Sequence, residues 1–389
     1  MQMYPDFLTT EPLLTDEQAA ALRVALAGRT VVCNYGAGVD SLAMILALRC
    51  AGITPDLLLF ANFDNEKKAT YTHLAKVRQM LAIWGWPTVT EVRYRPGPKT
   101  PYTDLLGNCL SNWTMPSLAF GKKGCSAKWK GKPLDDFLLG LSKGPNKRPP
   151  HPLWLRSQAS GSKIVKLIGY DASAADRERA GRIEVDEDGP FEYCYPLQLL
   201  GWRRRDCLDA IVRLLGLDMV PVKSACFFCP GMKPWEIFHA AYDDPDQLDL
   251  ALHMEANAML GKNSRYRADD FGGTWLELID SPVLVVSSKA KTQGASVLGL
   301  GREFAWNQFC RIHQILDEHG KVRRGDADRA RFLEMAMRLR TDDNALDARC
   351  GIDFGTVPAR QRRRVIPIAR QQSLDLDAAT SSEGGCARA

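Results

Sequence analysis

The chain has 389 residues, of which 45% are hydrophobic and 25% are charged, and its net charge at neutral pH is +5. These values are typical of a soluble globular protein with room for one large core or two ordinary domains. No apolar run in the sequence reaches the ~18 residues that a membrane-spanning helix needs, which excludes such a helix. The first ten residues also lack a secretory signal pattern.

The 11 cysteines indicate a cytoplasmic protein. An odd number of cysteines scattered through a long chain favours a reducing compartment over a disulfide framework. Because the sequence predicts no membrane-spanning helix, we also expect no membrane partner. The mild positive charge permits contact with a nucleotide or a nucleic acid but does not demonstrate either.

The first stretch with a chemical pattern is residues 29–46. A helix over residues 16–27, capped near Thr15, leads into a buried strand that includes Thr30, Val31 and Val32. Small residues follow, and then an apolar stretch with helical spacing. A strand, a glycine-rich turn and a helix N-terminus together predict an anion-binding loop, because free N–H groups and the helix dipole converge there.

The turn reads Gly36-Ala37-Gly38-Val39-Asp40-Ser41 and resembles the Ser-Gly-Gly-x-Asp-Ser loop of the ATP pyrophosphatase (PP-loop) superfamily. The resemblance implies that the phosphates of ATP, or of another adenylyl nucleotide, lie over this turn and the preceding Tyr35. It also implies that Asp40 takes part in the reaction and makes Mg²⁺ a candidate cofactor. Gly36 and Ala37 depart from the pattern. The alternative is an ordinary strand-to-helix turn with Asp40 and Ser41 as an N-cap.

A second apolar stretch, Ile53 to Phe60, predicts a strand parallel to the first, joined by a right-handed crossover. Ligands of such sheets bind beyond the carboxyl ends of the strands. The segment that follows resembles a segment of phosphoadenosine phosphosulfate reductase-like members of the superfamily, with Asn62, Glu66 and Thr70 at the matching spacing. This implies nucleotide contacts by Asn62 and Glu66. The alternative is a helix start decorated with acidic residues.

A helix over 72–83 and a strand from Val89 to Tyr94 come next. Residues 124–134 resemble the same reductase-like group, through Cys125 and the alternating Lys128 and Lys130. Lysines near a nucleotide neutralise phosphate charge, which makes Lys128 a candidate catalytic residue. A solvated basic loop is the alternative.

Residues 141–163 have the composition of an exposed insertion, and the next strand is expected at Ile164 to Ile168. The loop over 169–180 again resembles the family. It contains Arg177, our candidate for gripping a phosphate or sulfate with two donors. Asp171 stands where the family often has Arg.

The segment from Pro221 to Gly231 contains a Cys-x-x-Cys, formed by Cys226 and Cys229. With Cys125 it supplies three thiolates, and a fourth ligand comes from Cys194, Cys207 or Cys109, or is absent. The superfamily resemblance favours an iron–sulfur cluster, and the spacing fits zinc equally well. Buried structural cysteines are the third alternative.

The last third of the chain falls outside the resemblance. The pattern from 236 to 260 is helical, and further helices are expected over 301–317 and 327–340. We divide the chain into a helical lead-in, a nucleotide-binding domain with the Cys-x-x-Cys site, a mainly helical region and a basic, disordered tail. Their limits are 1–27, 28–240, 241–358 and 359–389.

The fold predicted is an α/β doubly wound, mostly parallel sheet of the adenine nucleotide alpha hydrolase type. The predicted function is that of a phage or bacterial PP-loop enzyme that adenylates a substrate, releases pyrophosphate and serves sulfur transfer, with a sulfur-donor protein and, through the basic C-terminal region, nucleic acid as partners. A sulfonucleotide reductase is the first alternative, and its thiol would be Cys350. A non-catalytic nucleotide- or nucleic-acid-binding module is the second.

Overall fold

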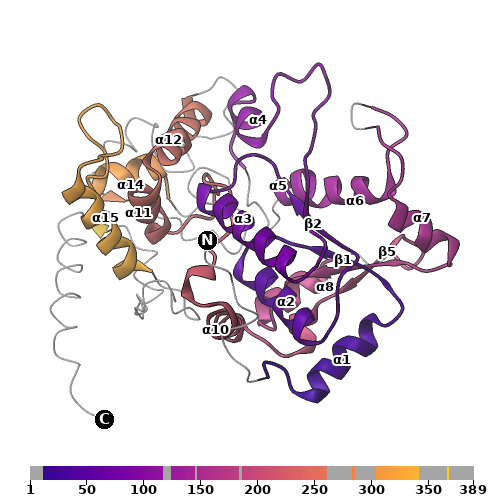
Figure 1. Ribbon diagram of the computed structural model, residues 1–389. Coiled ribbons are helices and arrows are strands. Elements are labelled where there is room, and N and C mark those ends of the chain that lie inside the picture. The colour runs from indigo at the N-terminus through magenta and orange to yellow at the C-terminus, as the bar shows by residue number, and fades with distance from the viewer. Residues whose placement is uncertain are drawn as a thin grey trace, which may run out of the picture. The chain divides into compact units, whose positions relative to one another are not determined.

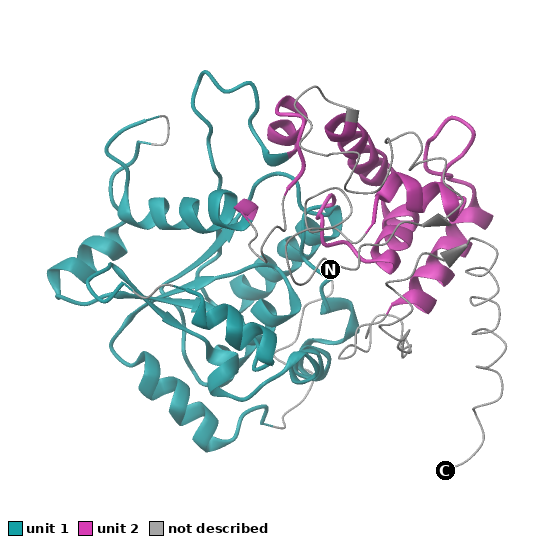
Figure 2. Ribbon diagram, turned by 180° about the vertical axis from the view of Figure 1, so that it is seen from behind, with its two compact units in different colours: residues 1–105, 126–226, 342–353 teal, residues 106–125, 227–341, 354–389 magenta. Residues whose placement is uncertain are grey.

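The computed structural model divides the chain into two compact units, shown in different colours in Figure 2. Unit 1 holds the described residues up to 105 and those from 126 to 226, and unit 2 holds the others. No helix among the described residues is long and apolar enough to cross a membrane. The structure describes residues 12–116, 124–144, 147–183, 186–260, 283–284, 304–340 and 366–367.

Unit 1 is built on a five-stranded sheet in the order β3-β2-β1-β4-β5 (Figure 1). Every neighbouring pair in it is parallel. The strands are β1 (Thr30–Asn34), β2 (Leu57–Ala61), β3 (Val89–Val92), β4 (Ile164–Ile168) and β5 (Phe191–Cys194).

Helices occupy every long connection of this sheet, as parallel strands require. The chain runs from α1 (Asp16–Leu26) through α2 (Val39–Cys50), α3 (Lys68–Ile83), α4 (Leu105–Ser111), α5 (Gly124–Ser126), a π-helical turn (Ala127–Gly131), α6 (Lys132–Leu139), α7 (Pro152–Ala159), α8 (Ala174–Gly181), α9 (Pro196–Leu199), α10 (Arg204–Leu215) and a 3₁₀ turn (Leu217–Met219).

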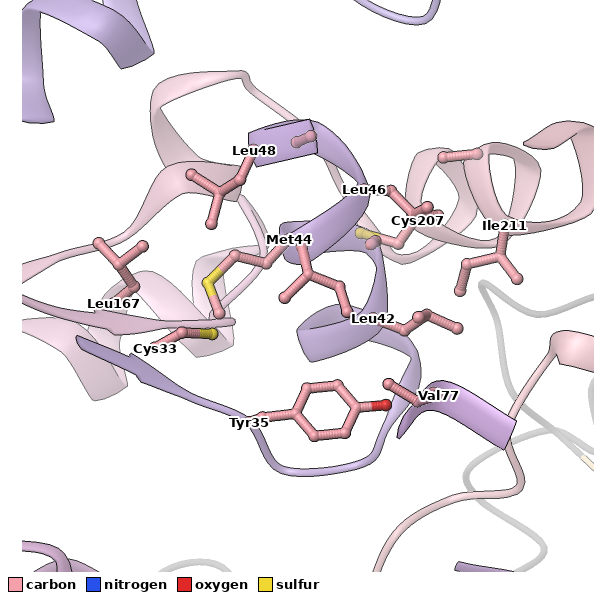
Figure 3. Packing of buried hydrophobic residues seen from close by; sticks show 14 of the residues in the cluster. Cys33, Tyr35, Leu42, Met44, Leu46, Leu48, Val77, Leu167, Cys207 and Ile211 are labelled. Atoms are coloured by element: carbon pink, nitrogen blue, oxygen red, sulfur yellow. The ribbon is translucent and has the colours of Figure 1, made fainter. Parts of the chain in front are cut away.

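The sheet is covered on both faces. Alternate residues of β1 point to opposite sides, so that Val31 and Cys33 join a core built with α1, α2, α3 and α10, and Val32 joins a second core built with α6. Figure 3 shows the first core around α2, where Cys33, Leu167 and Cys207 meet the helix from three different elements. Helices on both faces confirm the predicted doubly wound fold.

The strand order reverses between β1 and β4. The chain moves outward from β1 to β2 and β3, and then crosses back to place β4 on the other side of β1. In open α/β sheets, ligands bind outside the carboxyl ends of the strands at this reversal. The residues that follow Asn34 and Ile168 therefore form the first place to look for a site.

Most elements lie where the sequence predicts them. The first helix has the predicted cap, because Thr15 accepts a hydrogen bond from the Gln18 N–H. The strand Ile164–Ile168 has the predicted limits. The predicted insertion over 141–163 needs correction, since Pro152–Ala159 forms α7, which begins with His151 as its N-cap. The strand β5 was not predicted.

Unit 2 is helical in its described residues. It contains α11 (Pro234–Asp243), α12 (Pro245–Leu260), α14 (Trp306–Ile312), α15 (Asp326–Leu339) and a two-residue pairing of β6 (Val283–Leu284) with β7 (Ile366–Pro367). Its core includes Phe238, whose ring centre lies 5.5 Å from that of Phe309 and 6.4 Å from that of Phe332. The predicted helices over 301–317 and 327–340 correspond to α14 and α15. Cys350 and most of the predicted tail lie outside the described residues.

Candidate functional site

The loop after β1 connects Asn34 to Val39, the first residue of α2. Ala37 has a φ of +53°, a left-handed conformation that glycine adopts more easily. Gly38 is extended and forms the N-cap, and its N–H donates to the Ser41 Oγ at 3.1 Å. Ser41 thus closes the turn from inside the helix. The alternative in which Asp40 and Ser41 themselves cap the helix is not what the backbone shows.

The first turn of α2 points its N–H groups at the loop. The N–H groups of Val39, Asp40 and Ser41 have no acceptor within the helix, because the first turn of any helix lacks one. No side chain of the described residues caps them. The positive end of the helix dipole lies at the same place. The strand, the turn and the helix start are present as predicted, and anion binding by this loop stays a prediction.

Two glycines allow the backbone to pack tightly here. A Cβ on Gly169, which directly follows β4, would lie 2.9 Å from the Ser41 N and 3.0 Å from the Asp40 carbonyl carbon. A Cβ on Gly38 would lie 2.8 Å from the Ser224 Oγ. The loop after β4 therefore abuts the start of α2, at the reversal of the strand order.

Asp40 forms an ion pair with Arg204, the first residue of α10. The Arg204 Nη1 donates to the Asp40 Oδ2 at 2.8 Å, and about a quarter of each side chain is exposed. Burial raises the pKa of Asp40, the Arg204 guanidinium opposes this shift, and the carboxylates of Asp171 and Asp176 add to it. Among the described residues, nothing hydrogen-bonds the buried Asp40 Oδ1.

Arg204 is the main residue that the sequence did not single out. Its position is fixed by the loop after β4, because the Ala172 N–H donates to the Trp202 carbonyl at 2.7 Å. The signal in the sequence was the run of arginines from Arg203 to Arg205. Nothing in that run indicates which of the three meets Asp40.

The loop after β2 has a different character. The Asn62 amide donates to the Glu91 Oε2 at 2.6 Å, and its oxygen accepts from the Asp64 N–H at 2.8 Å and from the Tyr71 hydroxyl at 3.0 Å. Asn62 is buried. Its predicted contact with a nucleotide would compete with these three protein partners.

Glu66 lies against two other elements of unit 1. Its Oε1 accepts from the Lys130 Nζ at 2.7 Å, and its side chain has no exposed surface. Its backbone forms a bridge with Cys226. The Lys130 charge is therefore paired with a carboxylate, and the Lys130 ammonium lies 4.8 Å from the centre of the Phe63 ring.

The other predicted nucleotide and catalytic residues lie apart from one another. The Tyr35 side chain points into the core under α2, next to Val77 in Figure 3, and its hydroxyl lies 3.2 Å from the His73 Nε2. Lys128 is exposed and lies over the Tyr94 and Trp129 rings. Arg177 is exposed, and its Nε donates to the Ala172 carbonyl at 3.2 Å. Of these residues, only Arg177 lies in α8, the helix that follows the loop after β4.

The predicted metal ligands fall in both units. Cys194 ends β5, and burial raises the pKa of its thiol to about 11. Cys226 belongs to unit 1, whereas Cys125 and Cys229 belong to unit 2. The described residues contain no group of three or more His, Cys, Asp or Glu side chains that could hold a metal ion. The iron–sulfur cluster and the zinc site stay predictions.

No protein-family profile and no curated protein matches the chain. Among solved structures, it is similar to a phosphoadenylyl-sulfate reductase from Candida auris, with 15% identity over 52% of this chain and 80% of that one, at a TM-score of 0.30. It is also similar to the U34-tRNA thiolase NcsA from Methanococcus maripaludis with its [4Fe-4S] cluster. The identity there is 12%, over 63% of this chain and 79% of that one, at a TM-score of 0.32.

Proposed function

We propose that unit 1 binds ATP or another adenylyl nucleotide with its phosphates over Gly36 to Ser41. In the reaction that we propose, an acceptor oxygen attacks the α-phosphate, pyrophosphate leaves, and the adenylated acceptor is ready for displacement of AMP by sulfur. The observation that carries the proposal is the first turn of α2, whose N–H groups open at the reversal of the strand order.

The packing of the loop supports a phosphate ligand in particular. Glycine at 38 and at 169 lets the Ser224 hydroxyl and the loop after β4 pack against the first turn of α2 with no Cβ between them, which holds the N–H groups of this turn in place. The ion pair with Arg204 holds the Asp40 carboxylate beside the loop and reduces its repulsion of an anion. The exposed guanidinium of Arg177 would add charge neutralisation at the leaving pyrophosphate.

The reaction needs positioning and charge neutralisation more than a protein base. The loop would bind and orient the phosphates, and Arg177 would balance charge that builds up as pyrophosphate leaves. We assign no step to a metal cluster, which stays a prediction from the sequence. The names of the two solved structures, one a sulfonucleotide enzyme and the other a tRNA thiolase, agree with a role in sulfur chemistry.

The test combines ATP binding by calorimetry with a pyrophosphate-release assay. We expect the wild type to bind ATP, pyrophosphate to compete for the site, and Asp40→Ala to abolish release. Gly36→Ser is the matched control: a Cβ at Gly36 meets only the Ser41 Oγ, at 3.9 Å, and the substitution restores a residue of the family pattern. It should retain binding.

Two outcomes would overturn parts of the proposal. A wild type that does not bind ATP would remove the nucleotide site itself. A wild type that binds ATP tightly, yet releases no pyrophosphate with any acceptor fraction, would favour the non-catalytic binding module. A circular dichroism spectrum of Asp40→Ala that matches the wild type ensures that lost release does not reflect unfolding.

A further inference from the structure

A concave site in unit 1 shares no residue with the loop after β1. It is a pocket of about 320 Å³ between the residues that follow β3 and the segment that joins α6 to α7. Arg95 contributes from the first segment, and Lys147, Arg148 and His151 contribute from the second. The other lining residues are Phe137 and three prolines, Pro149, Pro150 and Pro152.

The pocket is lined by positive charge. Arg95, Lys147 and Arg148 bring three cations to it, and no carboxylate is among the residues that line it. The nearest acidic residues in sequence, Asp135 and Asp136, are paired with Lys166 and Lys132. A cavity that gathers cations attracts anions through its local potential. The pocket therefore suits an anion with more than one charge.

The backbone around the pocket is fixed. Leu141 and Arg148 exchange two N–H to carbonyl hydrogen bonds, each of 3.0 Å, which close the base of the segment. The His151 N–H donates to the Leu138 carbonyl at 2.9 Å. Gly140 has a φ of +79°, and a Cβ there would lie 2.6 Å from the Pro150 N. The backbone of Arg148 is thus held in place before any ligand arrives, and Lys147 directly precedes it.

Phe137 is the aromatic residue of the pocket, and a guanidinium and an imidazole lie close to its ring. The Arg148 guanidinium lies 5.4 Å from the centre of the Phe137 ring, and the His151 ring lies 5.3 Å from it. The His151 Nδ1 accepts from the Leu153 N–H at 3.2 Å, so that the neutral ring carries its proton on Nε2 and can donate it. With these two groups on Phe137, the pocket offers donors for an oxyanion and little ring surface for stacking a base.

We propose that this pocket binds the phosphate group of a nucleotide unit, through Lys147, Arg148 and Arg95, without reading the base. Arginine and lysine around a cavity free of carboxylates are the usual partners of phosphate oxygens. Two sources share this chemistry, a free nucleotide and the backbone of a nucleic-acid strand. The site is independent of the nucleotide proposed at the loop after β1.

The experiment measures fluorescence anisotropy of the full chain with a labelled single-stranded oligonucleotide of mixed sequence. AMP and inorganic phosphate are the competitors, and the titration is repeated over a range of salt concentrations. We expect Lys147→Glu with Arg148→Glu to weaken binding at least tenfold and to reduce the slope of log affinity against log salt by about 1.4, since each phosphate contact on a single strand contributes about 0.7. Lys147→Glu alone, at an exposed position, should give a smaller loss of the same kind.

Lys76→Glu is the control, because this cation lies on α3 and pairs with Asp218. It should leave the slope within about 0.5 of the wild-type value. If AMP displaces the oligonucleotide, the pocket is assigned to a free nucleotide. Failure of AMP to displace it, with the double variant still weakened, would assign the pocket to a strand. Unchanged affinity and slope in the double variant would overturn the proposal. A wild type that does not bind the oligonucleotide would overturn it as well.

ATP binding separates this proposal from the preceding one. The Lys147 and Arg148 variants should bind ATP at the loop after β1 as the wild type does. Asp40→Ala should bind the oligonucleotide normally. Each site therefore fails or survives by its own measurement.

Discussion

The loops after β1 and β2 both follow a buried strand of the same sheet, and both carry residues that resemble one family of nucleotide enzymes. After β1, the polar groups are the N–H groups of the first turn of α2, which have no acceptor within the helix, and Gly38 and Gly169 let neighbouring segments pack closely against this turn. After β2, the polar groups are side chains that already bind one another. Asn62 has three protein partners, and Glu66 is paired with Lys130.

This difference separates a ligand site from a structural polar cluster. An open N–H group gains a hydrogen bond when an anion binds, whereas Asn62 or Glu66 would first have to lose one. Exchanging a buried hydrogen bond for another yields little net free energy. We therefore expect substitutions after β2 to change the stability of unit 1, and substitutions after β1 to change ligand binding more than stability.

The largest effect on stability is expected for Lys130→Met. The substitution keeps most of the aliphatic stem but leaves the fully buried Glu66 carboxylate without its ammonium partner. Breaking a fully buried pair from one side costs about 3 kcal/mol or more, and we expect a loss of up to about 3 kcal/mol here, since 38% of the Lys130 side chain is exposed. Urea unfolding should show this loss of free energy, with ATP affinity of the folded protein unchanged.

Lys132→Met is the control for that measurement. Lys132 pairs with Asp136 one turn along α6, and 63% of its side chain is exposed. Pairs of this kind contribute little, so the control should unfold close to the wild type. A Lys130→Met protein as stable as the Lys132→Met protein would show that the Glu66 pair is not structural.

Gly169→Ala should give the next largest effect, and it acts on the first loop. The new methyl group would lie within 3.0 Å of backbone atoms of Asp40 and Ser41, so that α2 or the loop after β4 must shift. Overpacking of this kind costs about 1–3 kcal/mol. Because the shift moves the first turn of α2, we also expect ATP affinity to fall, as calorimetry would show.

Gly36→Ala provides the comparison for Gly169→Ala. Its methyl group would meet only the Ser41 Oγ, at 3.9 Å, an ordinary contact. Its unfolding free energy and ATP affinity should stay close to those of the wild type. Equal losses in the two variants would mean that close packing at Gly169 is not what positions the loop.

The pH dependence of stability offers a smaller effect at Asp40. Burial raises the pKa of this carboxyl despite Arg204. The folded state therefore holds the proton more tightly than the unfolded state, and stability falls as pH rises from about 4, where an unfolded Asp titrates, through the raised pKa. Asp40→Asn removes this contribution, so the variant should gain stability relative to the wild type as pH rises.

The matched variant is Asp209→Asn, at a largely exposed carboxylate on α10. Its unfolding free energy should follow the wild-type pH profile. Thermal unfolding at several pH values compares the three proteins. An Asp40→Asn curve parallel to the wild type would show that Asp40 is not destabilised by burial. We expect the gain in stability to accompany a loss of pyrophosphate release, since functional sites often retain groups that cost stability.

The sequence was sufficient for the frame of unit 1. Runs of β-branched and apolar residues fix the central strands, and the turn at Gly36 to Ser41 shows where a strand gives way to a helix. These signals are local, so they can be recognised in a single sequence. The strand order follows from one long crossover between β3 and β4, which brings Gly169 against α2.

The partners of the polar residues were not predictable in the same way. Lys130 is 64 residues from Glu66, and Arg204 is 164 residues from Asp40. Neither pairing leaves a trace in spacing or periodicity, because both arise where distant elements pack. The sequence therefore grouped Lys130 with Lys128 as lysines that neutralise phosphate charge, although the Lys130 charge is paired with Glu66, and gave Arg204 no role.

The smallest effect is expected at Ala37, where the chain departs from the family pattern. The left-handed conformation of this residue costs alanine about 1 kcal/mol relative to glycine. Ala37→Gly would recover that cost but would lose a buried methyl group worth about 0.8 kcal/mol and add about 0.5–1 kcal/mol of unfolded-state entropy. These contributions nearly cancel, so we expect the free energy of unfolding in urea to change by less than about 1 kcal/mol. Ala37→Val, with a β-branched side chain in the same conformation, should be clearly less stable. A large gain from Ala37→Gly would instead show that the loop is strained, and ATP affinity measured on the same protein would then tell whether that strain serves binding.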